Sequence, residues 1–216
     1  MAHRTRWLAW CLVLASGSTA AAQTTPLRAP DLEGTVTLER ALSQRRSNRR
    51  VAKTPLSLET IGQLLWAAQG VTNNKGFRTA PSAGARYPLE IYVLIPGGLF
   101  RYVPKKHALV QLSDKDLRRA VWKHAYARAW LADAPAIFFI AGVYGRTAGK
   151  YGQRARRYVH IEVGHAGQNL LLQAAALGLH CVGVGAFSDR QVQKTLGLPA
   201  AHVPLYAIPV GRPPAR

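Results

Sequence analysis

The sequence predicts an α+β domain, in which hairpin-connected strands and a long helix share one core. The β-rich run 89–95 is followed, after Gly97 and Gly98, by two further short runs that together are typical of a meander. The run 136–141 is apolar without alternation, as in a strand covered on both faces. One long helix is predicted over about 154–179. Because 48% of the residues are hydrophobic, the chain can bury the core of such a domain.

The first 22 residues have the pattern of a secretory signal peptide. Arg4 and Arg6 precede an apolar run over 7–15, and small residues ending at Ala22 follow it. The run is too short to span a bilayer. We therefore expect cleavage after Ala22, export of the mature chain 23–216 to the periplasm or the medium, and no integral membrane segment after the signal is removed.

The cysteine content and the net charge limit which disulfides, lipid anchors and binding partners the protein can have. Cys11 lies within the predicted signal and follows Trp10, which is too large for lipoprotein cleavage, so we expect no lipidation there. Cys181 is then the single cysteine of the mature chain, and no internal disulfide can form. The formal charge of +19 suits an anionic partner. Its local clustering and the predicted export disfavour nucleic acid, whereas a basic surface-binding protein stays open as an alternative.

The mature chain begins with an extended arm and two helices. Residues 23–36, with two prolines, are predicted to form the arm, and residues 37–216 the folded domain. Thr37 is predicted to cap a short helix. Ser57 is predicted to cap a second helix that ends at Gly70 and carries a stripe of core residues.

A basic turn follows the first predicted helix. The turn consists of Arg45, Arg46, Ser47, Asn48, Arg49 and Arg50. Guanidinium groups and a hydroxyl donor suit a phosphate dianion, and each charge-assisted bond contributes about 1.5–3 kcal/mol where water is excluded. A solvated basic turn is the alternative.

A loop of small residues precedes the first strand of the meander. The loop contains Pro81, Ser82, Ala83 and Gly84, whose side chains are too small to pack a hydrophobic core. We expect residues 82–85 to expose backbone N–H groups to a planar or anionic ligand. An ordinary loop leading into a strand is the alternative.

Residues 81–88 read P-S-A-G-A-R-Y-P, which resembles a signature of the nitroreductase-like flavoproteins, in particular the SagB/ThcOx branch that oxidises azoline rings. The resemblance implies that Pro81, Ser82, Ala83 and Gly84 contact FMN, partly across a dimer interface. The basic turn resembles the R-x-S-x-R element of the family. This implies that Arg45, Ser47 and Arg49 bind the phosphate, the ribityl chain and the pyrimidine edge of FMN. Arg46 is expected to bind the cofactor with them as part of the basic turn.

Lys150 and Tyr151 are adjacent in a predicted loop over 149–152. By themselves they are typical of a solvent-facing pair. They resemble a Lys-Tyr pair of the azoline-oxidising branch, which implies a catalytic role in proton transfer near the flavin. A substrate that loses a hydride must also lose a proton, and a lysine with a lowered pKa or a tyrosine relay could accept it.

The long helix combines an apolar face with a polar stripe. Glu162, His165 and Asn169 are spaced three and four apart, so they share one face and require partners from a cofactor cavity or a neighbouring helix. For His165, a satisfied interior histidine is the favoured interpretation. His160 and His165 are five residues apart and do not form H-E-x-x-H, so we expect no metal site. The resemblance implies that this helix forms the core of a dimer.

The C-terminal region is predicted as a glycine-bearing strand over 180–187, a helix capped by Ser188, and a strand over 205–210. Its glycines do not form G-x-G-x-x-G in a βαβ setting, so we do not predict a dinucleotide fold. The resemblance implies that the backbone at Gly185 and Ala186 lies against the flavin ring and that Arg212 completes the phosphate site.

The resemblance covers residues 37–212 and rests on four segments in the same order. It implies a nitroreductase-like fold with an antiparallel-rich central sheet flanked by helices, a homodimer, and FMN at the interface. The expected function is two-electron hydride transfer through FMN on a small-molecule or peptide substrate. A nitro- or quinone-reducing enzyme and a non-enzymatic exported flavin-binding module are the alternatives that share the cofactor.

Overall fold

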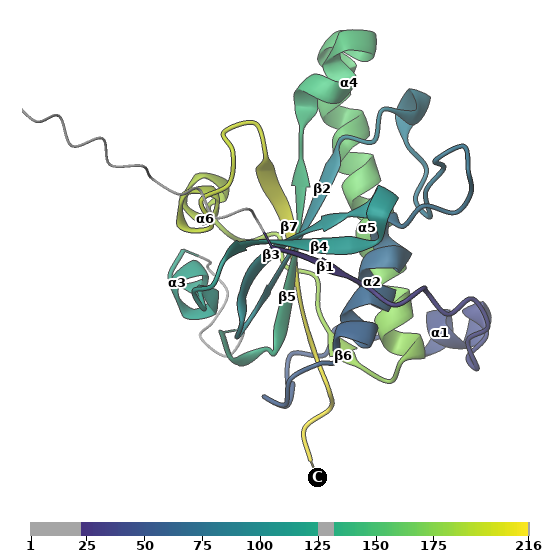
Figure 1. Ribbon diagram of the computed structural model, residues 1–216, viewed down its shortest axis with the longest axis vertical. Coiled ribbons are helices and arrows are strands. Elements are labelled where there is room, and N and C mark those ends of the chain that lie inside the picture. The colour runs from purple at the N-terminus through teal and green to yellow at the C-terminus, as the bar shows by residue number, and fades with distance from the viewer. Residues whose placement is uncertain (1–22, 125–131, 216) are drawn as a thin grey trace, which may run out of the picture.

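An antiparallel sheet of seven strands forms the centre of the protein (Figure 1). The computed structural model describes residues 23–124 and 132–215; the predicted signal peptide, the apolar residues Tyr126, Trp130 and Leu131, and Arg216 lie outside them. The strand order is β1-β4-β3-β2-β5-β7-β6. The strands are β1 (Thr24–Pro26), β2 (Leu89–Ile95), β3 (Gly98–Val103), β4 (Ala108–Ser113), β5 (Ala136–Gly142), β6 (His180–Cys181) and β7 (Val203–Gly211).

The predicted meander and the doubly covered strand are both confirmed. β2, β3 and β4 pair in sequence as antiparallel neighbours. Gly98 permits the tight entry into β3, because its φ is 123° and a Cβ there would lie 2.0 Å from the Ser113 carbonyl oxygen. β5 lies between β2 and β7, and its seven residues are all buried.

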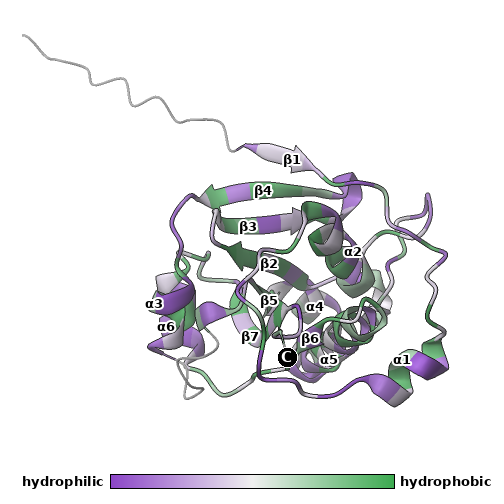
Figure 2. Cartoon of the chain, turned by 90° about the horizontal axis from the view of Figure 1, so that it is seen from below, coloured by the Kyte–Doolittle hydropathy of each residue, from purple (hydrophilic) through white to green (hydrophobic). Residues whose placement is uncertain are grey.

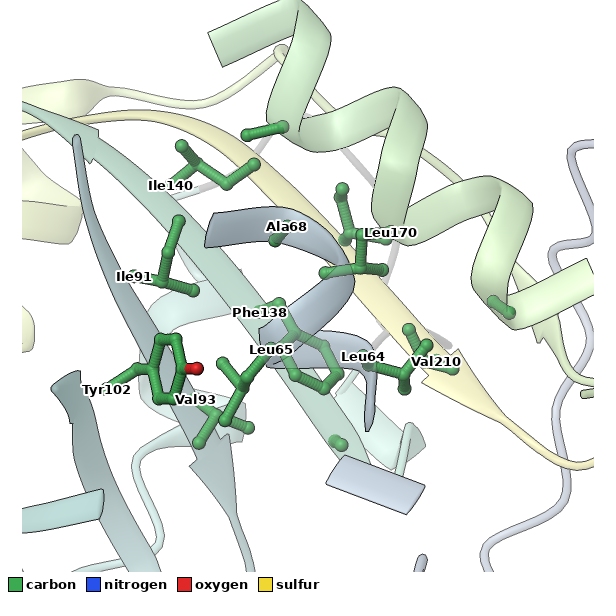
Figure 3. Close-up of a cluster of buried hydrophobic side chains, with 14 of the residues drawn as sticks. Leu64, Leu65, Ala68, Ile91, Val93, Tyr102, Phe138, Ile140, Leu170 and Val210 are labelled. Atoms are coloured by element: carbon green, nitrogen blue, oxygen red, sulfur yellow. The ribbon is translucent and has the colours of Figure 1, made fainter. Parts of the chain in front are cut away.

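Helices cover both faces of the sheet (Figure 2). α2 (Leu58–Gln69) and α5 (Ala155–Ala176) pack on one face, and α3 (Arg118–Trp122) and α6 (Asp189–Thr195) lie on the other. Figure 3 shows the hydrophobic core between the sheet and the helices α2 and α5, in which Leu64 and Leu65 of α2 and Leu170 of α5 pack near Phe138 of β5. α1 (Leu38–Gln44) and α4 (Tyr144–Tyr151) flank the same side as α5.

Helix boundaries follow local chemistry. The Thr37 hydroxyl accepts the Arg40 N–H at 3.2 Å, and the Ser57 hydroxyl accepts the Thr60 N–H at the same distance, so these two predicted N-caps are confirmed. Ser188 precedes α6 as predicted, but its side chain makes no capping hydrogen bond. Gly70 ends α2 as predicted. The last helical residue of α5 is Ala176, three residues before the predicted end.

The extended arm over 23–36 contributes β1, which pairs with β4 at the edge of the sheet. Two local predictions were wrong. Lys150 and Tyr151 lie in the last turn of α4 rather than in a loop. The glycine-bearing segment 180–187 keeps only two strand residues and one bridge, between Val184 and Ala207; beyond Cys181 it runs as a loop along β7.

Within residues 23–124 and 132–215, no helix has the length and apolar character needed to cross a membrane. The same residues contain no group of three or more histidine, cysteine, aspartate or glutamate side chains placed to hold a metal ion.

Candidate functional site

The basic turn is fixed beside β6 by its backbone. Ser47 forms a parallel bridge with Cys181, and the Asn48 N–H donates to the Cys181 carbonyl at 2.9 Å. The Ala52 N–H donates to the Arg212 carbonyl at 2.8 Å, so the C-terminal arginine emerges at the same end of the sheet. A cavity of about 180 Å³ is lined there by Arg45, Arg46, Asn48, His180, Cys181 and neighbouring residues. The structure thus places the basic turn and the backbone of Arg212 at the same end of the sheet, with Arg45 and Arg46 lining the cavity.

The arginines of the turn differ in what they contact. The Arg46 guanidinium donates to the carbonyls of Ser43 and Arg45 at 2.9 and 2.8 Å, so it supplies hydrogen bonds to carbonyl groups that are left free at the C-terminal end of α1. Arg45 is half-buried and faces Cys181 and Tyr206. Burial raises the pKa of Cys181 to about 11, and the Arg45 charge acts in the opposite direction. Ser47, Arg49 and Arg212 are exposed.

Tyr206 of β7 lines a second cavity. Its ring fits because two neighbours lack a side chain: a Cβ at Gly167 would lie 2.7 Å from the ring, and one at Gly183 would lie 1.9 Å from the hydroxyl. The cavity has a volume of about 340 Å³ and includes Val163, Gly164, Leu171, Leu205, His160 and Gln168 in its lining. Gly185 and Ala186 are exposed nearby in sequence, and a Cβ at Gly185 would meet no atom within 4 Å. The cavity therefore lies along the middle of α5, and its Tyr206 is within the field of the Arg45 charge.

The loop of small residues has a strained backbone. Gly84, Ala85 and Tyr87 have φ angles of 58°, 53° and 46°. The loop closes on itself, because the Ala85 N–H donates to the Ser82 carbonyl at 3.0 Å and the Tyr87 N–H to the Ser82 hydroxyl oxygen at 2.8 Å. Left-handed backbone at non-glycine residues persists only where surrounding contacts enforce it.

These contacts come from the polar stripe of α5. Glu162 Oε1 accepts the Ala83 N–H at 3.0 Å, and Asn169 Nδ2 donates to the Thr79 carbonyl at 3.3 Å. The partner of the stripe is therefore the loop. The predicted exposure of the amides was wrong for Ala83 and Ala85, because both are bonded within the protein. His165 is exposed, so its interpretation as an interior histidine was also wrong.

Lys150 and Tyr151 lie against the same loop. A Cβ at Gly84 would be 2.8 Å from the Tyr151 hydroxyl and 3.0 Å from Lys150 Nζ, so only glycine leaves room for both groups. The Tyr151 ring packs edge-on against Tyr158, with centroids 5.0 Å apart. A cavity of about 280 Å³ is lined by Pro81, Ser82, Ala83, Tyr158, Ile161, Glu162 and His165. A titratable pair and a buried acid thus meet at one loop.

The loop and the basic turn lie toward opposite ends of α5. Glu162 contacts the loop, whereas Ala175 lines the cavity beside Arg45 and Arg46. At about 1.5 Å of rise per residue, these two positions on the helix are roughly 20 Å apart. The structure therefore does not bring all the predicted site residues together within one protomer.

Two functional candidates were missed at the level of sequence. Tyr206 gave no signal, because its fit depends on Gly167 and Gly183, which are distant along the chain. Arg78 packs its guanidinium 4.4 Å from the centroid of the Tyr87 ring and donates to Gln69 Oε1 at 2.8 Å. Arg78 could have been noticed as a cation directly before the small-residue loop.

Comparison with known proteins identifies the family of this chain. The model of the nitroreductase family matches residues 42–212. A protein of Methanocaldococcus jannaschii that is provisionally named a nitroreductase is 42% identical over 195 residues, covering 88% of this chain and 97% of that protein. A crystal structure of a provisionally named nitroreductase from Ralstonia eutropha JMP134 has a TM-score of 0.82 at 29% identity, covering 89% of this chain and 90% of that one.

A chain of the E. coli microcin synthetase McbBCD complex, solved with truncated pro-MccB17 bound, has a TM-score of 0.69 at 21% identity, covering 97% of this chain and 85% of that one. This likeness shows the fold alone. The family match, the identity to the archaeal relative and the shared sheet and helices lead to one conclusion: the chain belongs to the nitroreductase family.

Proposed function

We propose that this protein is an FMN-dependent oxidoreductase that transfers two electrons as hydride through bound flavin. The observation that carries the proposal is that the basic turn and the backbone of Arg212 meet beside β6, while Tyr206 lines a cavity along α5 with its hydroxyl against Gly183 and within the field of Arg45. Members of its family generally use FMN. The relatives named as nitroreductases favour an oxidoreductase as well.

The residues of these regions fit the chemical groups of FMN. Arg45, Ser47, Arg49 and Arg212 would hold the phosphate, because guanidinium forks match its oxygens and each such bond contributes about 1.5–3 kcal/mol when desolvated. The open backbone at Gly185 and Ala186 and the apolar cavity lined by Tyr206 suit a flat ring. Arg46 donates its hydrogen bonds to the carbonyls of Ser43 and Arg45, so we assign it a smaller contribution to FMN binding.

We propose a homodimer in which the site is completed by the second copy. In one protomer the Pro81–Gly84 loop is roughly 20 Å along α5 from the basic turn. Two-fold packing of α5 would place the loop of one protomer over the basic turn of the other. Apolar side chains exposed on α1 and near both ends of α5 support this packing: Leu38, Leu42, Ile161 and Leu177 are 60%, 51%, 48% and 43% exposed.

The bound flavin would supply the electron transfer, and the protein would supply binding, orientation and proton handling. Lys150 and Tyr151 are the groups we assign to proton transfer, because the Lys150 ammonium group and the Tyr151 hydroxyl lie against the loop that would contact the flavin ring. Lys150 must lose its own proton to act as a base. The Tyr151 hydroxyl, which reaches the same point, can pass a proton between substrate and lysine.

For the substrate we favour a small molecule or peptide that is oxidised, as in the SagB/ThcOx branch, on the basis of the Lys150–Tyr151 pair. Reduction of nitro compounds or quinones is the second candidate, and the names of the relatives favour it. We also propose export after cleavage at Ala22, which N-terminal sequencing of the protein from its host would test. An exported enzyme would have little access to NAD(P)H, so the electron donor distinguishes the two candidates.

Anaerobic titration of the FMN-loaded protein tests the proposal. Bleaching of the flavin absorbance by an azoline-containing peptide supports the first candidate, and bleaching by NAD(P)H supports the second. In the first case Lys150→Ala and Tyr151→Phe should slow bleaching without releasing FMN. Flavin that no donor reduces would instead indicate a flavin carrier, and a protein that never binds FMN would leave the basic surface-binding alternative.

A further inference from the structure

Glu162 is a buried acid without a structural counter-charge at bonding distance. It is 3% exposed and is the one carboxylate among the buried side chains of the described residues. One oxygen, Oε1, accepts the Ala83 N–H at 3.0 Å. The other, Oε2, is buried and has no hydrogen-bond partner among the described residues. Leaving such an atom unsatisfied opposes folding, so the position calls for another explanation.

Several groups face this carboxylate. Ser82 and Ala83 of the loop and Arg78 before it lie on one side, and His165 of α5 is close on the helix itself. Tyr158 shares the lining of the cavity, and Lys150 and Tyr151 lie beyond Gly84. Burial raises the pKa of Glu162, whereas the Ala83 amide, the Ser82 hydroxyl, His165 and Arg78 act in the opposite direction.

The sign of this shift matters for stability. A carboxyl whose pKa is raised by folding contributes stability below its unfolded pKa, and that stability is lost as the pH rises through its folded pKa. The ionised form of Glu162 therefore weakens the fold at neutral and alkaline pH. A group with only a structural role would not be expected to carry this penalty.

The strained loop is what the carboxylate contacts. Gly84, Ala85 and Tyr87 hold left-handed backbone directly beside the Ala83 amide that Glu162 binds. A charged acceptor binds an N–H more strongly than a neutral one does. An ionised Glu162 therefore holds this part of the loop more firmly than a protonated one.

We propose that Glu162 is a positioning residue for the flavin: its carboxylate holds Ser82 and Ala83 in the conformation that contacts FMN, and its protonation weakens FMN binding. This inference rests on the proposed function, because it takes FMN as the ligand of the loop. Lys150 and Tyr151 depend on the same anchor, since they pack against Gly84.

The dissociation constant of FMN, measured by quenching of flavin fluorescence from pH 5 to 9, tests the proposal. We compare the unaltered protein with Glu162→Gln and with the matched control Glu59→Gln, which changes an exposed acid on α2 that pairs with Arg28. At high pH, Glu162→Gln should bind FMN about tenfold more weakly, because a neutral acceptor replaces a charged one. The ratio of the two constants should fall toward one at low pH. Titration of the FMN phosphate affects both proteins and cancels in this ratio.

A second readout separates positioning from simple structural support. Glu162→Gln should unfold at a higher urea concentration than the unaltered protein, and the difference should grow with pH, because a buried charge has been removed. Equal FMN affinity of Glu162→Gln and the unaltered protein at every pH would overturn the proposal. So would a weaker affinity accompanied by lower stability.

If the unaltered protein binds no FMN, the proposed function fails. Hydrogen exchange of the backbone amides then still tests whether Glu162 holds the loop. In the ligand-free protein, Glu162→Leu removes the acceptor and should speed exchange of the Ala83 amide at least tenfold, relative to Glu59→Gln. Unchanged protection of that amide would show that Glu162 does not hold the loop.

Discussion

The two ends of α5 present their ligand-facing groups in different ways. At the basic turn, the side chains of Ser47 and Arg49 are exposed, and the turn is attached to β6 through its backbone, by the bridge between Ser47 and Cys181. At the small-residue loop, hydrogen bonds from Glu162 and Asn169 fix a strained backbone. The difference suggests a division of roles. Charge recognition of a phosphate tolerates exposed side chains, whereas alignment of a ring requires a backbone held in one conformation.

Removing the cations of the basic turn should have the largest effect. Arg45→Ala combined with Arg49→Ala should weaken FMN binding at least a hundredfold, because two charge-assisted bonds of about 1.5–3 kcal/mol each are lost. Equilibrium dialysis with FMN measures the change. Lys105→Ala with Lys106→Ala, which removes the same charge from the turn between β3 and β4, is the control and should bind normally.

The cysteine beneath the basic turn should make the fold sensitive to alkali. The folded pKa of Cys181 is about 11 against an ordinary value of 9.0, so the stability that it contributes below pH 9 is lost as the pH rises toward 11. Two pKa units correspond to about 2–3 kcal/mol. Urea unfolding should show this additional loss in the unaltered protein relative to Cys181→Ala. Parallel losses in both proteins would contradict it.

The small-residue loop should be less tolerant of a methyl group than the loop at Gly185. Gly84→Ala places a Cβ 2.8 Å from the Tyr151 hydroxyl at a φ of 58°, and we expect it to lower the free energy of unfolding by about 1–2 kcal/mol. Gly185→Ala meets no atom within 4 Å and should change it by less than about 0.5 kcal/mol. Similar values for the two variants, measured by chemical denaturation, would remove the distinction between the two loops.

The smallest effect is expected at Arg46. Its guanidinium serves the carbonyls at the end of α1, so Arg46→Ala should weaken FMN binding less than about threefold and lower stability by about 0.5–1 kcal/mol. Isothermal titration with FMN, compared with Arg45→Ala alone, measures the difference. A loss as large as that of Arg45→Ala would mean that Arg46 turns toward the ligand.

Much of this architecture could be predicted from the sequence, because the meander, the buried strand and the capped helices each have a local signal. The small-residue loop could be located for the same reason. Its hydrogen bonds could not, since Ala83 is bonded to a residue of α5 that lies far along the chain. The cavity over Tyr206 was equally hidden, because it depends on two glycines from separate elements. Local patterns thus located the candidate site, and long-range packing determined which groups are free within it.

The central claim is that the basic turn forms a flavin phosphate site. The most direct measurement is the absorbance spectrum of the purified protein after incubation with FMN and removal of the free flavin. We expect the bands of oxidised flavin to remain with the unaltered protein and with the Lys105 and Lys106 control, and to be lost when Arg45 and Arg49 become alanine. A folded, colourless protein that retains no flavin would contradict the account.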